Sequence, residues 1–274
     1  MVKDPESPIS SMHEAHKVQE RVAISAKIIY EAVRLEGEEE LERPGVALAW
    51  SGLAAGLSMG FSLLAEAALH AYLPDAPWTR LVSTAGYSIG FLIVILGAQQ
   101  LFTENTLTVI LPLLAHKNMA TVKKVLRLWG VVLAANIVGT FLFAFALARL
   151  GFLEPRLQAA VLSVSLAHAG PGFCVVLVRA VFAGWLIALM VWMMPDAATS
   201  RVAIIIILTY LIGIAGLSHI VAGSTNVFYL VATGHLTLGQ YFTTFFFPTV
   251  TGNILGGVSL VAALAHAQVV GGKK

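Results

Sequence analysis

Charged side chains are scarce in this sequence. Asp, Glu, Lys and Arg make up 12% of its 274 residues, whereas a typical soluble domain carries roughly 25%. The net charge of +2 is too small for binding to a phosphate backbone, which excludes nucleic-acid partners. The single cysteine, Cys174, excludes a disulfide framework and a multi-cysteine zinc site. Because 58% of the residues are hydrophobic, we predict an integral membrane protein.

Long apolar segments take the place of the missing charges. A membrane-spanning helix needs about 20 predominantly apolar residues. Six segments meet that requirement, and polar residues interrupt two of them. We therefore predict an all-α membrane protein in which a six-helix channel domain, residues 46–271, follows a polar tail, residues 1–45. The predicted spans are about 46–73, 81–115 (broken), 126–149, 172–194, 202–232 (broken) and 245–270.

Lysine and arginine are concentrated in the tail, in the segment after the second span and at the carboxyl end. Because cytoplasmic loops carry an excess of these residues, both termini are predicted to lie in the cytoplasm. Within the tail, apolar residues at helical spacing predict an amphipathic helix on the membrane surface or against a neighbouring subunit. These residues are Val18, Val22, Ala26, Ile29 and Val33. The acidic run 36–42 is interpreted as a solvated link to the first span.

An internal repeat is visible in the spans. Residues 135–140 and 252–257 both read small-Asn-Ile-aliphatic-Gly-small, three spans apart. Polar clusters at 99–106 and 218–226 interrupt the middle span of each half. An odd number of crossings separates the two copies, so the second is expected to be inverted. Interrupted spans at matching positions of two halves indicate a substrate path near the bilayer midplane. We predict two inverted three-helix repeats with broken second and fifth helices.

Three segments carry a resemblance to a known family, in the same order and with the same spacing. They are Gln100-Leu101-Phe102-Thr103, Gly216-Leu217-Ser218-His219 and the run from Pro248 to Gly257. The sequence resembles the formate/nitrite transporter family, and most of all its YfdC-type inner-membrane branch. The resemblance implies an aquaporin-like fold, a homopentamer with one pore per subunit and a place in the cell inner (plasma) membrane. It also implies passage of formate, nitrite, hydrosulfide or lactate, often together with a proton, and no cofactor.

The chain departs from the family pattern at several positions. Transporting members usually carry acidic residues where Gln100 and Ser218 stand, and asparagines where Gly223 stands and near Gly184. A vestibule lysine of the family has no counterpart, and His168 or its neighbours lie there. The resemblance therefore implies the pore architecture more directly than the identity of the substrate.

A central histidine is the main candidate for the substrate path. An anion in the bilayer faces a desolvation cost of at least several kcal/mol, and the imidazole of His219 can exchange a proton near neutral pH. Thr103 and Asn105 are interpreted as donors to the anion's oxygens, and Phe91, Leu101 and Ile212 as the apolar constriction. The alternative for His219 is a buried residue that only braces the helix break.

Other polar residues are assigned to the breaks and to packing. Glu104 either belongs to the ion pathway or bonds backbone donors that the break frees. The residues assigned to the helix breaks and to packing are Gln100, Gly223, Asn136 and Asn253. Glu66 and Arg179, single charges within spans, are interpreted as an ion pair or as residues at helix ends. Gly52, Gly56 and Gly60, four residues apart, predict a close-packing face.

The sequence thus predicts a channel or transporter for small monovalent anions or their weak acids, with a proton as candidate co-substrate. Two alternatives stay open: a neutral-solute channel of the aquaporin type and a closed pore with a regulatory role. The paired Asn-Pro-Ala motifs of aquaporins are absent. An enzyme is not expected, because we find no metal-ligand set and no nucleophile with a base at suitable spacing.

Overall fold

A computed structural model of the protein describes residues 25–169, 172–262, 267 and 269. Every regular element in these residues is helical, so the predicted all-α fold is confirmed. Four helical stretches are long and apolar enough to cross a membrane: Gly45–Tyr72, Thr79–Leu96, Met119–Arg149 and Phe173–Asp196. Three shorter apolar stretches are Asn105–His116, Ala198–Ile214 and Ile220–Ala232. The first is the second half of one interrupted span, whose first half is Thr79–Leu96, and the other two are the halves of the second interrupted span.

The first half of the channel domain is built around two long helices, α3 and α8, that pack on each other. Between α3 and α8 the chain forms the second span, which is interrupted after Leu96. The first half thus consists of two long helices and one broken span. Its elements are α3 (Gly45–Tyr72), α4 (Thr79–Ser83), a 3₁₀ turn (Thr84–Tyr87), α5 (Ser88–Leu96), α6 (Asn105–Thr108), α7 (Ile110–His116) and α8 (Met119–Arg149). The third span thus begins at Met119, earlier than the predicted residue 126.

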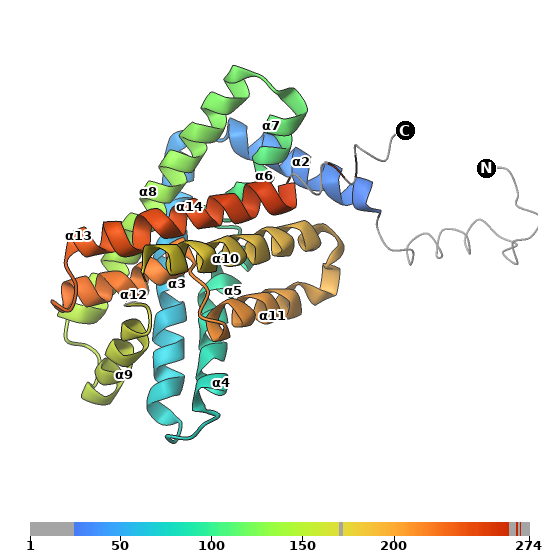
Figure 1. The fold of residues 1–274 in the computed structure, drawn as a ribbon. Coiled ribbons are helices and arrows are strands. Elements are labelled where there is room, and N and C mark those ends of the chain that lie inside the picture. Colours follow the sequence, from blue (N-terminus) through green and yellow to red (C-terminus); the bar gives the residue numbers. More distant parts are fainter. Residues whose placement is uncertain (1–24, 170–171, 263–266, 268, 270–274) are drawn as a thin grey trace, which may run out of the picture.

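The second half repeats this plan, preceded by a helix that the hydropathy pattern did not predict, α9 (Pro155–Leu166). The elements that follow α9 are α10 (Phe173–Met193), 3₁₀ turns (Met194–Asp196 and Ala198–Ser200), α11 (Arg201–Ile214), α12 (Ile220–Ala232), α13 (Leu238–Gln240), α14 (Phe247–Leu255) and π-helical turns (Tyr241–Phe246 and Gly256–Ala262). In Figure 1, α3 and α8 run steeply across α10, α11 and α14, which lie nearly horizontal. The end of the predicted sixth span lies partly outside the described residues.

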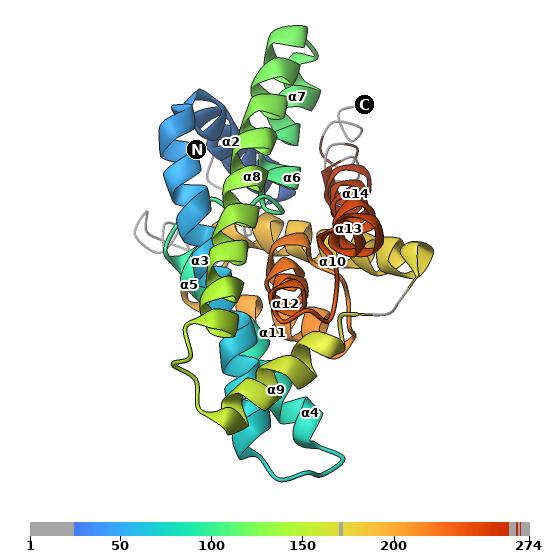
Figure 2. The same cartoon turned by 90° about the vertical axis from the view of Figure 1, so that its left-hand side faces the viewer.

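The tail helix α2 (Ala26–Glu42) ends at Glu42, beyond Val33, the last apolar position of the predicted pattern. The interpretation of residues 36–42 as a solvated link is wrong, because the acidic run is helical and packs on the channel domain. Gly37 fits directly against the backbone of Thr108, where a Cβ atom would overlap the carbonyl. Residues 18 and 22 of the predicted helix lie outside the described residues. Figure 2 shows α2 beside α7 and α8.

Polar contacts hold α2 against α7 and α8. The Nε2 atom of His116 lies 2.9 Å from Oε1 of Glu38, and Lys124 pairs with Glu42. Arg127 donates to the carbonyl of Leu41 at 2.7 Å, near the end of α2. These contacts are exposed or half-buried, so each contributes little to stability, but together they favour one orientation of the helix.

Close packing of the long helices depends on glycines at equivalent places in the two halves. A Cβ atom on Gly56 of α3 would overlap the carbonyl of Asn136 on α8, and one on Gly184 of α10 would overlap the carbonyl of Asn253 on α14. The predicted close-packing face of α3 is therefore confirmed. The equivalent contact in the second half explains why a glycine stands at position 184, near which the family pattern has an asparagine. The backbones of α10 and α14 approach each other too closely there for any side chain.

Substitution of Gly184 by alanine is expected to destabilise the protein. The new methyl group must push α10 and α14 apart, and overpacking of this kind costs about 1–3 kcal/mol. Gly130 of α8 is the matched control, because nothing lies within 4 Å of a Cβ built there and alanine favours a helix over glycine. Thermal unfolding in detergent should show a lower midpoint for Gly184→Ala and an unchanged or higher one for Gly130→Ala. Equal midpoints would contradict the close approach.

Candidate pore at the two helix breaks

The first break spans residues 97–104, between α5 and α6. The chain leaves α5 through Ala98, whose φ of 49° lies in the left-handed region. The N–H of Gln99 then donates to the carbonyl of Val94 at 2.9 Å, a pattern typical of a helix C-terminus. The chain after this turn is extended for a few residues and begins α6 in a new direction.

The second break, residues 215–219 between α11 and α12, is built in the same way. Gly216 takes the left-handed conformation, with a φ of 62°. The N–H of Leu217 donates to the carbonyl of Ile212 at 2.9 Å. Gly216 and Leu217 therefore stand where Ala98 and Gln99 stand in the first break.

Asn136 of α8 satisfies the backbone groups that the first break frees. Its Oδ1 atom accepts from the N–H of Phe102 at 2.9 Å. Its Nδ2 atom donates to the carbonyl of Gln100 at 2.9 Å and to that of Gly52 on α3 at 2.7 Å. The side chain is fully buried. One amide thus ties the break to both long helices, because backbone groups inside a membrane protein need partners.

Asn253 of α14 does the same at the second break. Its Oδ1 atom accepts from the N–H of Ile220 at 2.9 Å, and its Nδ2 atom donates to the carbonyls of Ser218 at 3.0 Å and Ala180 at 2.8 Å. This correspondence supports the internal repeat. The residue between the two bonded peptides is Leu101 in the first break and His219 in the second, so these two are structural equivalents.

The imidazole of His219 lies in the protein interior, with 1% of the residue exposed. Its Nδ1 atom accepts the N–H of Ala222 at 3.2 Å, which makes His219 the N-cap of α12. Its Nε2 atom lies 2.8 Å from Oγ1 of Thr103, in the first break. Phe91 of α5 meets the ring edge to face, with centroids 5.0 Å apart. The side chain therefore joins the two breaks.

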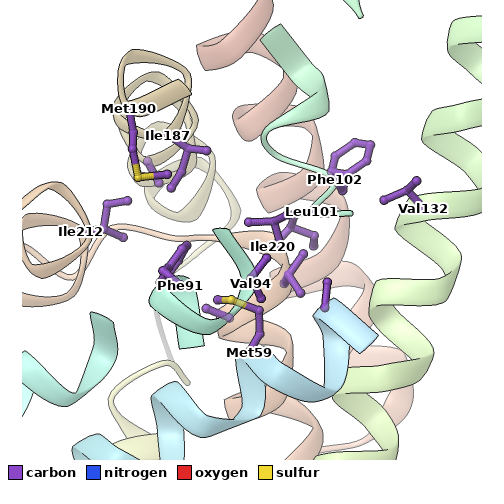
Figure 3. Close-up of a cluster of buried hydrophobic side chains, with 14 of the residues drawn as sticks. Met59, Phe91, Val94, Leu101, Phe102, Val132, Ile187, Met190, Ile212 and Ile220 are labelled. Carbon is purple, nitrogen blue, oxygen red and sulfur yellow. The ribbon is translucent and has the colours of Figure 1, made fainter. Parts of the chain in front are cut away.

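An apolar layer surrounds this histidine. Phe91, Leu101 and Ile212, the predicted constriction, have no exposed surface. Figure 3 shows all three within one cluster of buried hydrophobic side chains, together with Ile187 and Met190 of α10. The structure therefore brings together residues from both breaks and from both halves of the chain.

A cavity of about 380 Å³ lies on the α2 side of the layer, and we call it the α2-side cavity. Acidic and amide side chains line much of it. The charged residues among its lining are Glu36 and Glu40 of α2, Glu104 and Arg201 of α11, and the amides are Gln99, Gln100 and Asn105. Leu101 closes it toward the apolar layer.

A second cavity, of about 600 Å³, lies on the other side, and we call it the α9-side cavity. It is lined by α3, α4, α10 and the α9 segment, by which we mean α9 and the residues up to His168. Its titratable lining residues are Glu66, His70, Arg80, His168 and Arg179. Burial lowers the pKa of His168, and the positive charges of Arg179 and Arg80 lower it further. Among the described residues the two cavities share no lining residue. Leu101 of the apolar layer lines the first, and Tyr87, which contacts Phe91 of that layer, lines the second.

Three of the polar residues singled out from the sequence, Gln100, Glu104 and Asn105, line the α2-side cavity. Asn105 donates from Nδ2 to Oε1 of Gln100 at 3.0 Å and accepts from Thr108 at 3.2 Å. Its amide is therefore engaged away from His219, whereas Thr103 contacts the imidazole directly. Glu104 does not bond the backbone donors of the break in the described part of the chain, because Asn136 and Ser51 accept them. Glu104 lines the α2-side cavity, and its part in an ion pathway stays a prediction.

Two further expectations are revised. Gly223 lies one turn inside α12, where the ring of Phe245 packs against its Cα, so its role is packing. Glu66 and Arg179 form no ion pair within the described residues; Glu66 lies 3.4 Å from Oγ1 of Thr84, and both charges line the α9-side cavity. Arg80 was not singled out from the sequence. It lies at the start of the second span, and only the packing of the α9 segment makes it part of a cavity.

Comparison with known proteins agrees with this arrangement. The sequence profile described as Formate/nitrite transporter matches residues 27–267. The chain belongs to the formate/nitrite transporter family.

The chain is 41% identical to the inner membrane protein YfdC of Escherichia coli over 251 residues, which cover 92% of this chain and 81% of that protein. It is 24% identical to the formate channel BtFdhC of Bacillus thuringiensis, over 86% of this chain and 90% of that one. Among solved structures, a pentameric formate channel with formate bound superposes with a TM-score of 0.67 at 20% identity, over 86% of this chain and 99% of that chain. Members of the formate/nitrite transporter family are channels and transporters, and the two breaks lie within the matched residues.

Proposed function

We propose that this protein is a channel for small monovalent anions that cross the apolar layer as neutral weak acids, with proton exchange at His219. The observation that carries the proposal is the position of the imidazole. It is buried in the apolar layer between two polar cavities and is hydrogen-bonded to Thr103 of the opposite break. Formate and nitrite are the substrate class, in line with the family and with the formate channels among its relatives.

Electrostatics favours a neutral permeant. The apolar layer offers no fixed positive charge: Phe91, Leu101 and Ile212 are apolar, and the arginines lie outside it, in the two cavities. Moving an unpaired ion into such a layer costs at least several kcal/mol. A weak acid avoids this cost by taking up a proton, whereas the anion of a strong acid does not.

The hydrogen bonds of His219 determine which ring nitrogen carries the proton in the neutral imidazole. Because Nδ1 accepts the Ala222 N–H, the neutral ring carries its proton on Nε2, which donates to Oγ1 of Thr103. The hydroxyl proton of Thr103 is then free to bond the permeant. Proton uptake occurs at Nδ1 and releases the Ala222 N–H. The charged ring passes its Nε2 proton to Thr103, whose hydroxyl proton moves to the anion, and the ring is then neutral with its proton on Nδ1. Loss of the Nδ1 proton and uptake of a new proton at Nε2 return the ring to its starting form and restore the bond from the Ala222 N–H.

The assembly is proposed to be a homopentamer with one pore per subunit, as in the pentameric formate channel whose fold it shares. Large apolar side chains on the outside of the single chain, such as Trp50 and Phe141, are 69% and 41% exposed and suit lipid or a neighbouring subunit. We place the protein in the inner membrane, where its relative YfdC is located by name. We place α2 on the cytoplasmic side because lysine and arginine are concentrated in the tail and in the segment from Lys117 to Arg127 that α2 packs against.

Flux into proteoliposomes tests the proposal. At a fixed anion concentration, nitrite and formate flux should rise as the pH falls from 7 to 5, because more protons are available for exchange at His219. Nitrate is the matched control: it is similar in size to nitrite but is the anion of a strong acid, so its flux should stay low and independent of pH. Water or glycerol flux without anion flux would favour a neutral-solute channel, and no flux at all a closed pore.

A further inference from the structure

The two cavities differ in charge. Three carboxylates and one arginine line the α2-side cavity, and two arginines and one carboxylate line the α9-side cavity. An anion is therefore attracted to one side of the apolar layer and repelled on the other. Charged walls of a narrow cavity change the local concentration of a small ion about tenfold or more.

Glu36 is the acidic group of α2 that is least compensated in the α2-side cavity. Glu40, its neighbour one turn on, forms an ion pair with Arg43, with Nη1 and Oε1 3.0 Å apart. Glu38 and Glu42, on other faces of the helix, contact His116 and Lys124. Glu36 forms no ion pair within the described residues and lines the cavity with Glu104 and Arg201.

We propose that Glu36 is a charge filter: its carboxylate weakens anion loading from the α2 side, so that the anion loads more tightly from the α9 side. The inference rests on the proposed function and adds a specificity-determining residue that belongs to the tail helix. It also gives the acidic run a role, because α2 places Glu36 at the cavity, where a solvated link would leave it in bulk solvent.

The charged groups that face Glu36 come from three elements: Glu39 and Glu40 on α2, Glu104 at the first break and Arg201 on α11. The α10 segment contributes the uncharged Val191, Met194 and Pro195. Burial raises the pKa of Glu36, and the negative charge of Glu40 raises it further, while Arg201 lowers it. A raised pKa means that Glu36 is neutralised earlier than an ordinary carboxyl as the pH falls. Acid on the α2 side therefore weakens the filter.

Vesicles of defined orientation test the filter. Everted and right-side-out membrane vesicles present opposite faces to the medium, so initial nitrite uptake gives a KM for each side. Glu36→Gln should lower the KM on the α2 side about threefold to tenfold at neutral pH and leave that on the α9 side within about twofold. The wild-type difference between the sides should shrink at high salt.

Matched variants make the result decisive. Glu39→Gln removes the same charge from a position of α2 that adjoins Glu36 but does not line the cavity, so it should change the KM on the α2 side much less than Glu36→Gln does. Arg201→Gln removes the compensating positive charge and should raise the KM on the α2 side. This variant measures the effect of the cavity's charge on anion loading even if Glu36→Gln folds poorly. Equal effects of Glu36→Gln and Glu39→Gln would overturn the inference and leave the channel intact. Absence of nitrite flux in the wild type would refute the proposed function itself.

Discussion

Asn136→Ala and Asn253→Ala should each abolish stable folding or come close to it. Each substitution removes three hydrogen bonds and leaves one N–H and one carbonyl of the helix break unpaired in the protein interior, while the third partner, the carbonyl of Gly52 or Ala180, lies inside a helix and keeps its intrahelical bond. Single interhelical hydrogen bonds in membranes contribute about 0.6–2 kcal/mol, and an unsatisfied buried group costs about 1–3 kcal/mol. Three such losses at one residue amount to about 3–5 kcal/mol, a large share of a typical total stability.

The experiment compares thermal unfolding of the variants in detergent. Asn226→Ala is the matched control, because Asn226 is also a buried asparagine but its amide makes one hydrogen bond, to the carbonyl of Ala222 within its own helix. Its midpoint should fall much less. Asn136→Asp adds a second test: the carboxylate keeps the shape and the acceptor but loses the donors to Gly52 and Gln100, so it should also be strongly destabilised. A midpoint for Asn136→Ala equal to that of Asn226→Ala would refute the stabilising role of the Asn136 amide at the helix break.

The sequence was sufficient to predict the interrupted helices and the asparagines that hold them. The repeated small-Asn-Ile motif and the polar clusters inside apolar spans are local patterns, and backbone groups freed inside a membrane must find partners. The interpretation of Asn136 and Asn253 as interhelical hydrogen-bond residues agrees with their contacts. What the motif alone did not reveal is that Leu101 and His219 occupy equivalent positions, because that depends on which peptides each amide bonds.

The cavities could not be predicted in the same way. Glu66 and Arg80 belong to the first half of the chain, whereas His168 and Arg179 lie at the start of the second, and these residues meet only through the packing of α3, α4, α9 and α10. Helix α9 is short and weakly apolar, so hydropathy gave no sign of it. The placement of Glu36 was missed because a run of acidic residues is usually solvated, and here the contact between Gly37 and Thr108 brings the run onto the channel domain.

Replacement of His219 should separate its two roles, one in the helix break and one in proton exchange. As the N-cap of α12 the imidazole accepts the N–H of Ala222. Asparagine is among the best N-cap residues, so His219→Asn should preserve the cap, whereas His219→Leu loses it at a cost of about 1 kcal/mol. Neither side chain exchanges a proton near neutral pH, the property that the imidazole has.

Nitrite flux should therefore fall about tenfold or more in both variants at pH 5, and its dependence on pH should disappear, while only His219→Leu shows a lower unfolding midpoint. Thr103→Val gives the partner measurement, because it keeps the shape of the threonine and removes the hydroxyl 2.8 Å from Nε2. It should reduce the flux and leave the cap of α12 intact. If His219→Asn retained both the flux and its acceleration by acid, the imidazole would be only a brace for the helix break, and proton exchange would have to occur in the cavities, before the anion reaches the apolar layer.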